Sequence, residues 1–191
     1  MKTIIFVTGN PYKFQIAQKV LESKGLKVIQ EKLGTPEIQS VDVVEIASFS
    51  AKWAAEKLGK PVALTDAGYY IEALNGFPGP FIKYINIWLI SQDLLKLMQG
   101  KKNRKVVIKA CLVYCESGKE PITFPSEIAG TISEKAVKTD KEGNTPINEI
   151  FIPEGYSKVE TEIPRKEMVK FWAKTETYWG KLADYLSKSN I

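Results

Sequence analysis

The sequence has no histidine and only two cysteines among its 191 residues. Without histidine, a Ser-His triad, a histidine-metal cluster and imidazole acid-base chemistry are all excluded. Any catalysis must therefore use carboxylates, lysines, tyrosines and a bound metal ion. The cysteines, Cys111 and Cys115, lie four apart in a strand-like run, so they would be roughly 13 Å apart, too far for a disulfide. We therefore expect a reducing, cytoplasmic location.

Long apolar runs and blocks of like charge are also missing. We expect no membrane segment and no leader peptide, because the apolar N-terminal stretch is short and lacks a cleavage pattern. The net charge of +5 is spread among alternating signs, which favours a solvated surface over nucleic-acid binding. Nucleic-acid binding would instead show steep salt dependence and indifference to Mg²⁺. The length and the 44% hydrophobic content suit a single domain over residues 1–191, built of two lobes.

The order of helical and strand patterns predicts an α/β fold, a mixed β-sheet flanked by helices. We expect a ligand in a cleft between the two lobes. Apolar periodicity predicts helices at 12–23, 43–58, 82–89, 92–98 and 164–186, and strands at 3–7, 26–30, 61–64, 69–73, 105–115, 122–130, 131–135 and 150–152.

The first strand ends in Thr8-Gly9-Asn10, and an amphipathic pattern begins directly behind Pro11. This arrangement predicts a tight turn and a helix with proline at its first position. The turn would place uncapped backbone N–H groups, a hydroxyl, an amide and the Lys13 ammonium at one helix N-terminus, which attracts phosphate. The alternative is that Asn10 merely caps the helix and Lys13 is solvated. No GxxxxGK[ST] sequence is present, so this is not an ordinary P-loop.

Two carboxylates follow in positions that suit a metal site. Asp66 comes after the short strand at 61–64, and Gly68 would let the backbone turn sharply there; a simple turn aspartate is the alternative. Glu45 lies in the first turn of the helix at 43–58, where it also favours the helix dipole. Together they predict oxygen ligands for Mg²⁺, which prefers few carboxylates plus phosphate oxygens. Lys52 lies on about the same helix face as Glu45 and is a candidate for substrate binding. The alternative is that it is a solvated surface lysine.

The segment Thr8-Gly9-Asn10-Pro11-Tyr12-Lys13 matches the T-G-N-x-x-K opening of the inosine triphosphate pyrophosphatase family, which removes non-canonical purine nucleotides. The similarity continues through residues 36–39 and 45–53, through Thr65-Asp66-Ala67-Gly68, and through 73–84 with its G-F-P-G-P loop. Weaker similarity follows at 109–115 and 150–154. The chain resembles archaeal members most, and the resemblance spans nearly its whole length in the family's order.

The resemblance implies an elongated two-lobed fold with a central cleft, a homodimer, and Mg²⁺-dependent hydrolysis of a nucleoside triphosphate to monophosphate and pyrophosphate. By position, it implies that Lys13 holds the phosphates with help from the Thr8–Asn10 turn. Glu45 would bind the metal. Asp66 would act as the general base, orienting water toward the α-phosphorus. Lys83 would face the cleft.

Three parts of the family pattern are changed in this chain. Thr65 and Ala67 replace an acid and a hydroxyl residue of E-D-S-G or D-D-S-G. Thr145-Pro146-Ile147-Asn148 replaces aromatic-glycine-aromatic-aspartate; Asn both donates and accepts, so discrimination against ordinary bases should fall. The S-H-R triplet is missing from residues 169–175, where Lys174 could restore positive charge.

These changes leave two interpretations: an enzyme with altered base selectivity, or a catalytically impaired nucleotide-binding or interaction paralogue. Retention of the main charged residues favours the enzyme. The candidate catalytic residues are Asp66 and Lys13, the metal ligands Glu45 and Asp66, and the substrate-binding residues Thr8, Gly9, Asn10, Lys13, Lys52, Gly68, Lys83, Asn148 and Lys174.

Overall fold

The computed structural model describes residues 3–140 and 143–188, and the chain divides into two compact units. Unit 1 comprises Met1–Ala67, Ala110–Ser126 and Val169–Ile191. Unit 2 comprises Gly68–Lys109 and Glu127–Met168. The chain thus enters each unit more than once, and three strands and one helix continue from one unit into the other.

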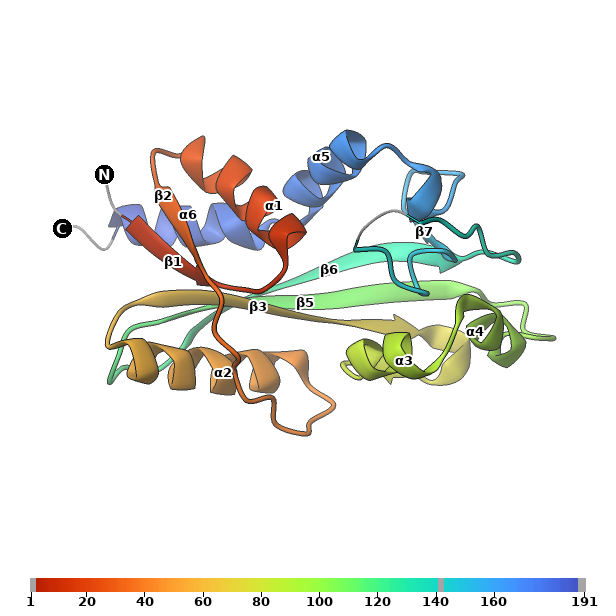
Figure 1. Cartoon of the computed structure of the whole chain (residues 1–191), viewed down its shortest axis with the longest axis horizontal. Helices are drawn as coiled ribbons and strands as arrows, with labels where there is room; N and C mark the ends of the chain where they lie inside the picture. Colours follow the sequence, from red (N-terminus) through yellow and green to blue (C-terminus); the bar gives the residue numbers. More distant parts are fainter. Residues whose placement is uncertain (1–2, 141–142, 189–191) are drawn as a thin grey trace. The chain divides into compact units, whose positions relative to one another are not determined.

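Helices flank a mixed sheet, as the sequence predicted (Figure 1). Its strands follow the order β2-β1-β3-β5-β6-β7, with β4 paired to β3. The helix at 43–58 and the strand at 105–115 were predicted to the residue. The elements are β1 Thr3–Val7, α1 Pro11–Glu22, β2 Lys27–Glu31, α2 Val43–Leu58, β3 Val62–Ile71, the 3₁₀ turn η1 Glu72–Leu74, β4 Pro78–Gly79, α3 Ile82–Trp88, α4 Ser91–Leu97, β5 Lys105–Cys115, β6 Ile122–Ile132, β7 Phe151–Pro153, η2 Glu160–Glu162, α5 Arg165–Thr175 and α6 Tyr178–Lys188.

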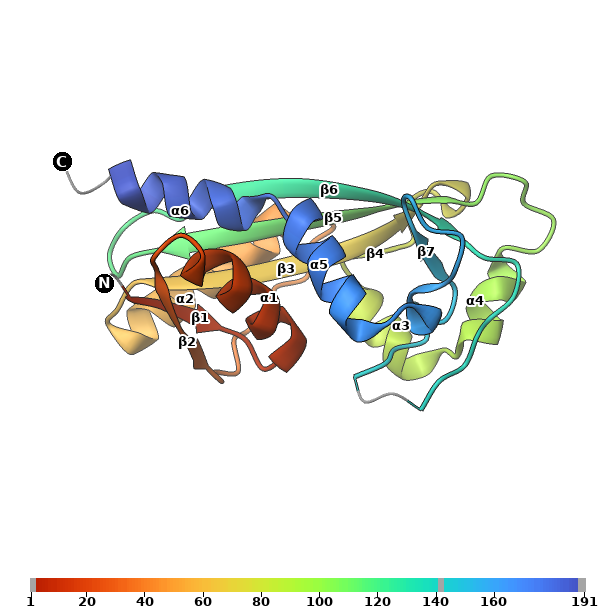
Figure 2. The same ribbon diagram turned by 90° about the horizontal axis from the view of Figure 1, so that it is seen from above.

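In unit 1, helices cover both faces of the sheet (Figures 1 and 2). The face of α2 toward the sheet carries alanines, and its small side chains let the helix approach the strands closely; the buried set is Ala47, Ala51, Ala54 and Ala55 against Val7, Val62, Leu64, Cys111, Val113 and Cys115. On the opposite face, α1 and α6 pack together. There the Phe6 ring meets Trp179 edge to face, with centroids 4.8 Å apart.

Both cysteines are free thiols, as expected from their spacing. They lie in the buried core beneath α2. Burial raises the pKa of Cys111 to about 11, so this thiol stays protonated at neutral pH.

Unit 2 is built around aromatic side chains and close backbone contacts. Tyr69 of β3 meets Phe151 of β7 edge to face, with ring centroids 5.5 Å apart. Lys109 lies over the Tyr70 ring, at 5.1 Å from its centroid, and pairs with Glu127 at 3.8 Å.

Among residues 3–140 and 143–188, no helix combines the length and apolarity needed to cross a membrane.

Three strand predictions are wrong. The strands expected at 61–64 and 69–73 are one continuous strand, β3, and the backbone does not turn at Gly68. That glycine is required for another reason: an added Cβ would lie 2.6 Å from the carbonyl carbon and oxygen of Gly79. The strand expected at 131–135 is not separate, because β6 runs on to Ile132.

The C-terminal helical pattern is also broken into two helices, α5 and α6, which meet at Glu176 and Thr177. Thr175 Oγ1 donates to the Phe171 carbonyl at 2.9 Å, and such back-bonding by threonine competes with regular helix geometry. The break places Glu176 at a corner, outside both helices.

Candidate functional site

The turn between β1 and α1 carries the predicted phosphate-binding residues. Asn10 Oδ1 accepts hydrogen bonds from the backbone N–H groups of Tyr12 at 2.8 Å and Lys13 at 3.2 Å. Thr8 Oγ1 in turn accepts from the Asn10 N–H at 3.1 Å. Asn10 therefore caps α1, and the expectation of uncapped N–H groups is wrong for these two donors. The Thr8 hydroxyl hydrogen and the ammonium of the half-buried residue Lys13 can still donate to an anion, and the helix dipole favours one there.

Strand β2 fixes the position of this turn. The Thr8 N–H donates to the Glu31 carbonyl at 3.0 Å, and Gln30 Nε2 donates to the Thr8 carbonyl at 3.0 Å. Both backbone groups of Thr8 are thus held by β2. The backbone that carries the side chains of this turn is therefore held in place by β2.

Asp66 and this turn both follow the last paired residues of β1 and β3. The two strands are parallel, with Val7, the last residue of β1, opposite Leu64. The turn begins directly after Val7, and Asp66 lies two residues beyond Leu64 on β3. Leu64 packs in the core beneath α2, and strand alternation puts Asp66 on that same face. The structure therefore brings Asp66 and the Thr8-Gly9-Asn10 turn to one edge of unit 1.

Glu45 is held at the start of α2. Ser40 Oγ donates to Glu45 Oε2 at 2.6 Å and accepts the Asp42 N–H at 3.0 Å. Asp42 Oδ1 caps the helix by accepting the Val44 N–H at 2.8 Å. The exposed Glu45 side chain is thus fixed by a short network rather than by burial.

Asp66 and the start of α2 act on the same buried thiol. Burial is the main cause of the raised Cys111 pKa, and the negative charges of Asp42 and Asp66 both add to it. In the described residues, no group of three or more Cys, Asp or Glu side chains could hold a metal ion by itself. A divalent cation near Asp66 would need further oxygens from its substrate, which is how Mg²⁺ is commonly bound.

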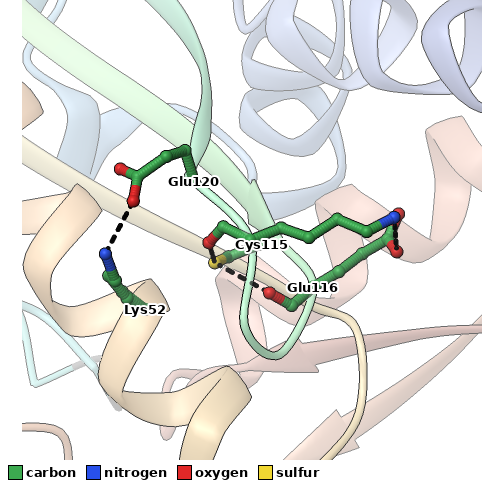
Figure 3. Close-up of polar contacts among 5 residues, drawn as sticks. Lys52, Cys115, Glu116 and Glu120 are labelled. Atoms are coloured by element: carbon green, nitrogen blue, oxygen red, sulfur yellow. Dashed lines mark hydrogen bonds and ion pairs between the residues drawn. The ribbon is translucent and has the colours of Figure 1, made fainter.

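Lys52 is engaged elsewhere on unit 1. Its Nζ donates to Glu120 Oε1 at 2.8 Å, in the turn between β5 and β6 (Figure 3). The hydrogen bond and charge of Glu120 raise the pKa of Lys52. The side chains are 44% and 87% exposed, so the pair lies at the surface. The structure shows Lys52 in an ion pair, while its substrate contact remains a prediction.

Lys174 is exposed in the last turn of α5, and two residues later lies Glu176, which sequence reasoning missed. Trp179 Nε1 donates to Glu176 Oε2 at 3.3 Å, and the Tyr178 hydroxyl also hydrogen-bonds this carboxylate. Burial of the carboxyl group raises the pKa of Glu176, and the nearby positive charge of Lys13 opposes that rise. No motif marks Glu176, because its place depends on the packing of α6 against α1.

Unit 2 holds the other three candidates. Gly68 packs against the backbone of Gly79 and Pro80, in the G-F-P-G-P loop. Lys83 Nζ lies 5.8 Å from the centroid of the Tyr84 ring. Thr145 Oγ1 donates to Asn148 Oδ1 at 2.9 Å, so the Asn148 acceptor is already used within its own turn.

Comparison with known proteins assigns the family. The Ham1 family model matches residues 4–175. A dITP/XTP pyrophosphatase of Methanopyrus kandleri is 39% identical over 173 residues, covering 91% of this chain and 90% of the relative. One of Methanosarcina acetivorans is 42% identical over 149 residues, covering 78% and 81%.

Solved structures agree on the fold. A HAM1 protein from Coxiella burnetii superposes with a TM-score of 0.79 at 20% identity, covering 98% of this chain and all of the other. The Staphylococcus aureus Ham1 protein gives 0.76 at 18% identity, covering 99% of this chain and all of the other. As its T-G-N-x-x-K and G-F-P-G-P motifs predicted, the chain belongs to the Ham1 family.

Proposed function

We propose that this protein hydrolyses nucleoside triphosphates, above all those with 6-oxopurine bases, to the monophosphate and pyrophosphate. The observation that supports the proposal is the parallel pairing of β1 with β3, after which Asp66 and the Thr8–Asn10 turn follow at the same edge of unit 1. Hydrolysis of a phosphoanhydride needs a proton acceptor for water and positive charge for the phosphates. Asp66 and Lys13 supply these groups, and the names of the curated relatives support the substrate class.

In the proposed reaction, Lys13, Thr8 and the start of α1 hold the triphosphate. Asp66 accepts a proton from a water molecule as the water oxygen attacks the α-phosphorus. The bond from that phosphorus to the α–β bridging oxygen breaks, and pyrophosphate leaves with the bonding electrons. Lys13 offsets the charge that accumulates on the leaving group.

A magnesium ion fits the donors of this site. Glu45 and Asp66 would hold it together with substrate phosphate oxygens, in keeping with its preference for few carboxylates. When bound, it would neutralise phosphate charge. The hydrogen bond from Ser40 to Glu45 supports this assignment, because it holds the carboxylate in place without burying it.

We propose that Asn148 and Lys174 contact the base, with relaxed selectivity. Because Asn148 Oδ1 accepts from Thr145, its amide N–H groups are the ones that would meet a base. An aspartate in this place would only accept hydrogen bonds, whereas an amide tolerates a ring acceptor. Lys52, Gly68 and Lys83 complete the proposed contacts, together with Gly9 of the turn.

We propose that the protein is cytoplasmic, where the free thiols of β5 would stay reduced. We also propose that two copies pair through α3. Two of its most exposed residues are apolar: Ile87 is 69% exposed and Trp88 71%. Trp88 also stacks on Tyr84, with centroids 5.6 Å apart. The helix carries one lysine and no acid, so in a chain of net charge +5 this face approaches its copy with little repulsion. Light scattering should show a dimer, and Trp88→Glu should yield a monomer.

The test of the function is a turnover panel. ITP, XTP, dITP, dUTP and the four standard ribonucleotides are incubated with and without Mg²⁺, and the phosphate products are identified. We expect pyrophosphate and monophosphate in equal amounts, and the fastest hydrolysis for the 6-oxopurine substrates. Nucleotide-induced thermal stabilisation without turnover would instead identify an impaired nucleotide-binding paralogue.

A further inference from the structure

The segment 144–149 contains the asparagine that we assign to the base, and side chains tie it to two short helices. Asn86 of α3 accepts the backbone N–H of Ile147 with its side-chain oxygen Oδ1, at 3.3 Å. Ser91, the first residue of α4, donates from Oγ to Glu149 Oε2 at 2.5 Å. All four residues belong to unit 2. Both sequence neighbours of the base-contacting asparagine are thus bonded to a helix.

Further hydrogen bonds close the segment on itself. Asn144 Nδ2 donates to Glu149 Oε1 at 3.0 Å, so both carboxylate oxygens of this glutamate accept hydrogen bonds. Bonds to a carboxylate are stronger than bonds between neutral groups. Thr145 Oγ1 donates to Asn148 Oδ1 at 2.9 Å, and the Asn148 N–H donates to the Thr145 carbonyl at 3.0 Å. Glu149 therefore connects the two ends of the segment, and Ser91 connects both ends to α4.

The residues that follow the segment are fixed by the sheet. The Ser133 N–H donates to the Ile150 carbonyl at 2.7 Å. Phe151, the first residue of β7, then pairs with Ile132 of β6. Such backbone bonds persist when side chains change. The part that carries Asn148 is tied to α3 and α4 by side chains, so a substitution on either helix can loosen it.

We propose that Asn86 and the Ser91–Glu149 pair are positioning residues, which hold the segment 144–149 so that Asn148 meets the base of the substrate. The inference rests on the proposed function, which places Asn148 at the base. It assigns a part in base recognition to two helices whose residues need not touch the nucleotide. A donor held in its bound geometry before binding loses less entropy on binding. These bonds should therefore contribute to affinity for the base and not for the phosphates.

The alternative is that the same bonds serve only the stability of unit 2. Asn86 is half-buried and Ser91 is buried, so removing either side chain leaves a partner without its hydrogen bond and costs stability. A folded variant with a purely structural defect would bind a nucleotide and a bare polyphosphate as before, or lose both equally. A positioning role predicts a selective loss, which affects only a ligand that carries a base.

The experiment compares these two kinds of ligand. An ITP analogue with a non-hydrolysable α,β-bridge and tripolyphosphate are titrated calorimetrically, each with Mg²⁺, into the unmodified protein and into Asn86→Leu. Leucine keeps the bulk of the side chain but has no acceptor. We expect Asn86→Leu to bind the analogue about three- to tenfold more weakly, as for the loss of one hydrogen bond, and tripolyphosphate equally well. Asn86→Asp keeps an acceptor for the Ile147 N–H and should restore most of the affinity.

The chain offers a matched control in Asn103→Leu. Asn103 Oδ1 also accepts a backbone N–H in unit 2, that of Lys105 at 3.0 Å, but its Nδ2 donates to Glu72 instead of to the segment. This variant should bind both ligands like the unmodified protein. Ser91→Ala removes the donor to Glu149 and should also weaken binding of the analogue alone. Thermal unfolding and circular dichroism check that each variant folds, and Ser91→Ala decides the question if Asn86→Leu does not fold.

The outcomes separate this inference from the proposed function. An equal loss for both ligands in Asn86→Leu, or unchanged affinity for the analogue, overturns the inference, while turnover of ITP by the unmodified protein keeps the function. Failure of Asn86→Asp to bind the analogue better than Asn86→Leu also contradicts it. A selective loss in Asn86→Leu but not in Ser91→Ala removes the Ser91–Glu149 pair from the proposal. If neither ligand binds the unmodified protein, the function and the inference are both overturned.

Discussion

The two compact units hold part of their candidate residues by different means. In unit 1, hydrogen bonds to both backbone groups of Thr8 hold the Thr8–Asn10 turn. In unit 2, side chains hold two of the three candidates: Thr145 bonds Asn148, and Lys83 lies over Tyr84. A site held by backbone keeps its geometry when neighbouring side chains change, whereas a site held by side chains changes with them. The changed base-recognition segment lies in unit 2.

The units also differ in charge around their candidates. In unit 1, Lys52 forms an ion pair with Glu120. In unit 2, Lys83 lies over the Tyr84 ring, whereas Lys109 lies over the Tyr70 ring and also pairs with Glu127. Lys52 must therefore exchange its partner in order to bind phosphate.

The largest expected effect tests the backbone-held site of unit 1. Asp66→Asn keeps the size and hydrogen-bonding capacity of the side chain but cannot take a proton from water. We expect kcat to fall by about 10²–10⁴ while the fold is kept. Pyrophosphate release measures the rate, and circular dichroism checks the fold. Asp184→Asn, an exposed carboxylate on α6, serves as the control and should retain full activity. Unchanged turnover in Asp66→Asn would remove Asp66 from the mechanism.

A second substitution tests the close packing in unit 2. In Gly68→Ala the new Cβ would lie 2.6 Å from Gly79 backbone atoms, so strand and loop must separate. We expect a loss of about 1–3 kcal/mol in the free energy of unfolding. Gly180→Ala, within α6, meets nothing within 4 Å and should stabilise by about 0.5–1 kcal/mol. Denaturant titration measures both. Equal effects would show that the loop moves aside freely.

The sequence was sufficient wherever the structure depends on local pattern. The spacing of alanines along α2 and the β-branched run of β5 predicted both elements to the residue. The residue pattern at 3–13 predicted the strand, the turn and the helix that begins at Pro11. Side chains within one strand–turn–helix segment lie close together without any contact from a distant part of the chain.

The sequence was insufficient where a distant segment decides. Gly68 was expected to turn because glycine commonly does, but Gly79 and Pro80 pack against it and β3 runs on through it. Glu176 has no motif at all: its place at the corner comes from a helix break and from its hydrogen bond with Trp179, whose ring packs on Phe6.

A third prediction tests the side-chain-held site of unit 2. Asn148→Asp replaces an amide by an acceptor-only carboxylate, which favours the protonated N1 of 6-oxopurines over the N1 acceptor of adenine. We expect the ratio of kcat/KM for ITP to that for ATP to rise by about tenfold, within the usual range for one polar group of a base pocket. Thr145→Val, which removes the hydroxyl that bonds Asn148, should change the same ratio less. Equal ratios before and after Asn148→Asp would place this residue outside the base pocket.

The smallest expected effect concerns the exposed ion pair of unit 1. Glu120→Gln removes the charge that holds Lys52 while keeping a hydrogen-bonding group in place. Because exposed pairs contribute little to stability, thermal unfolding should not change. If Lys52 exchanges Glu120 for a phosphate, its release should lower KM by about two- to threefold with kcat unchanged, the mark of uniform binding. Glu116→Gln, whose carboxylate pairs with Lys119 in the same turn, is the control and should leave KM unaltered. If both variants keep the KM of the unmodified protein, Lys52 does not contact the phosphates. The Thr8–Asn10 turn would then bind them in unit 1 without help from Lys52.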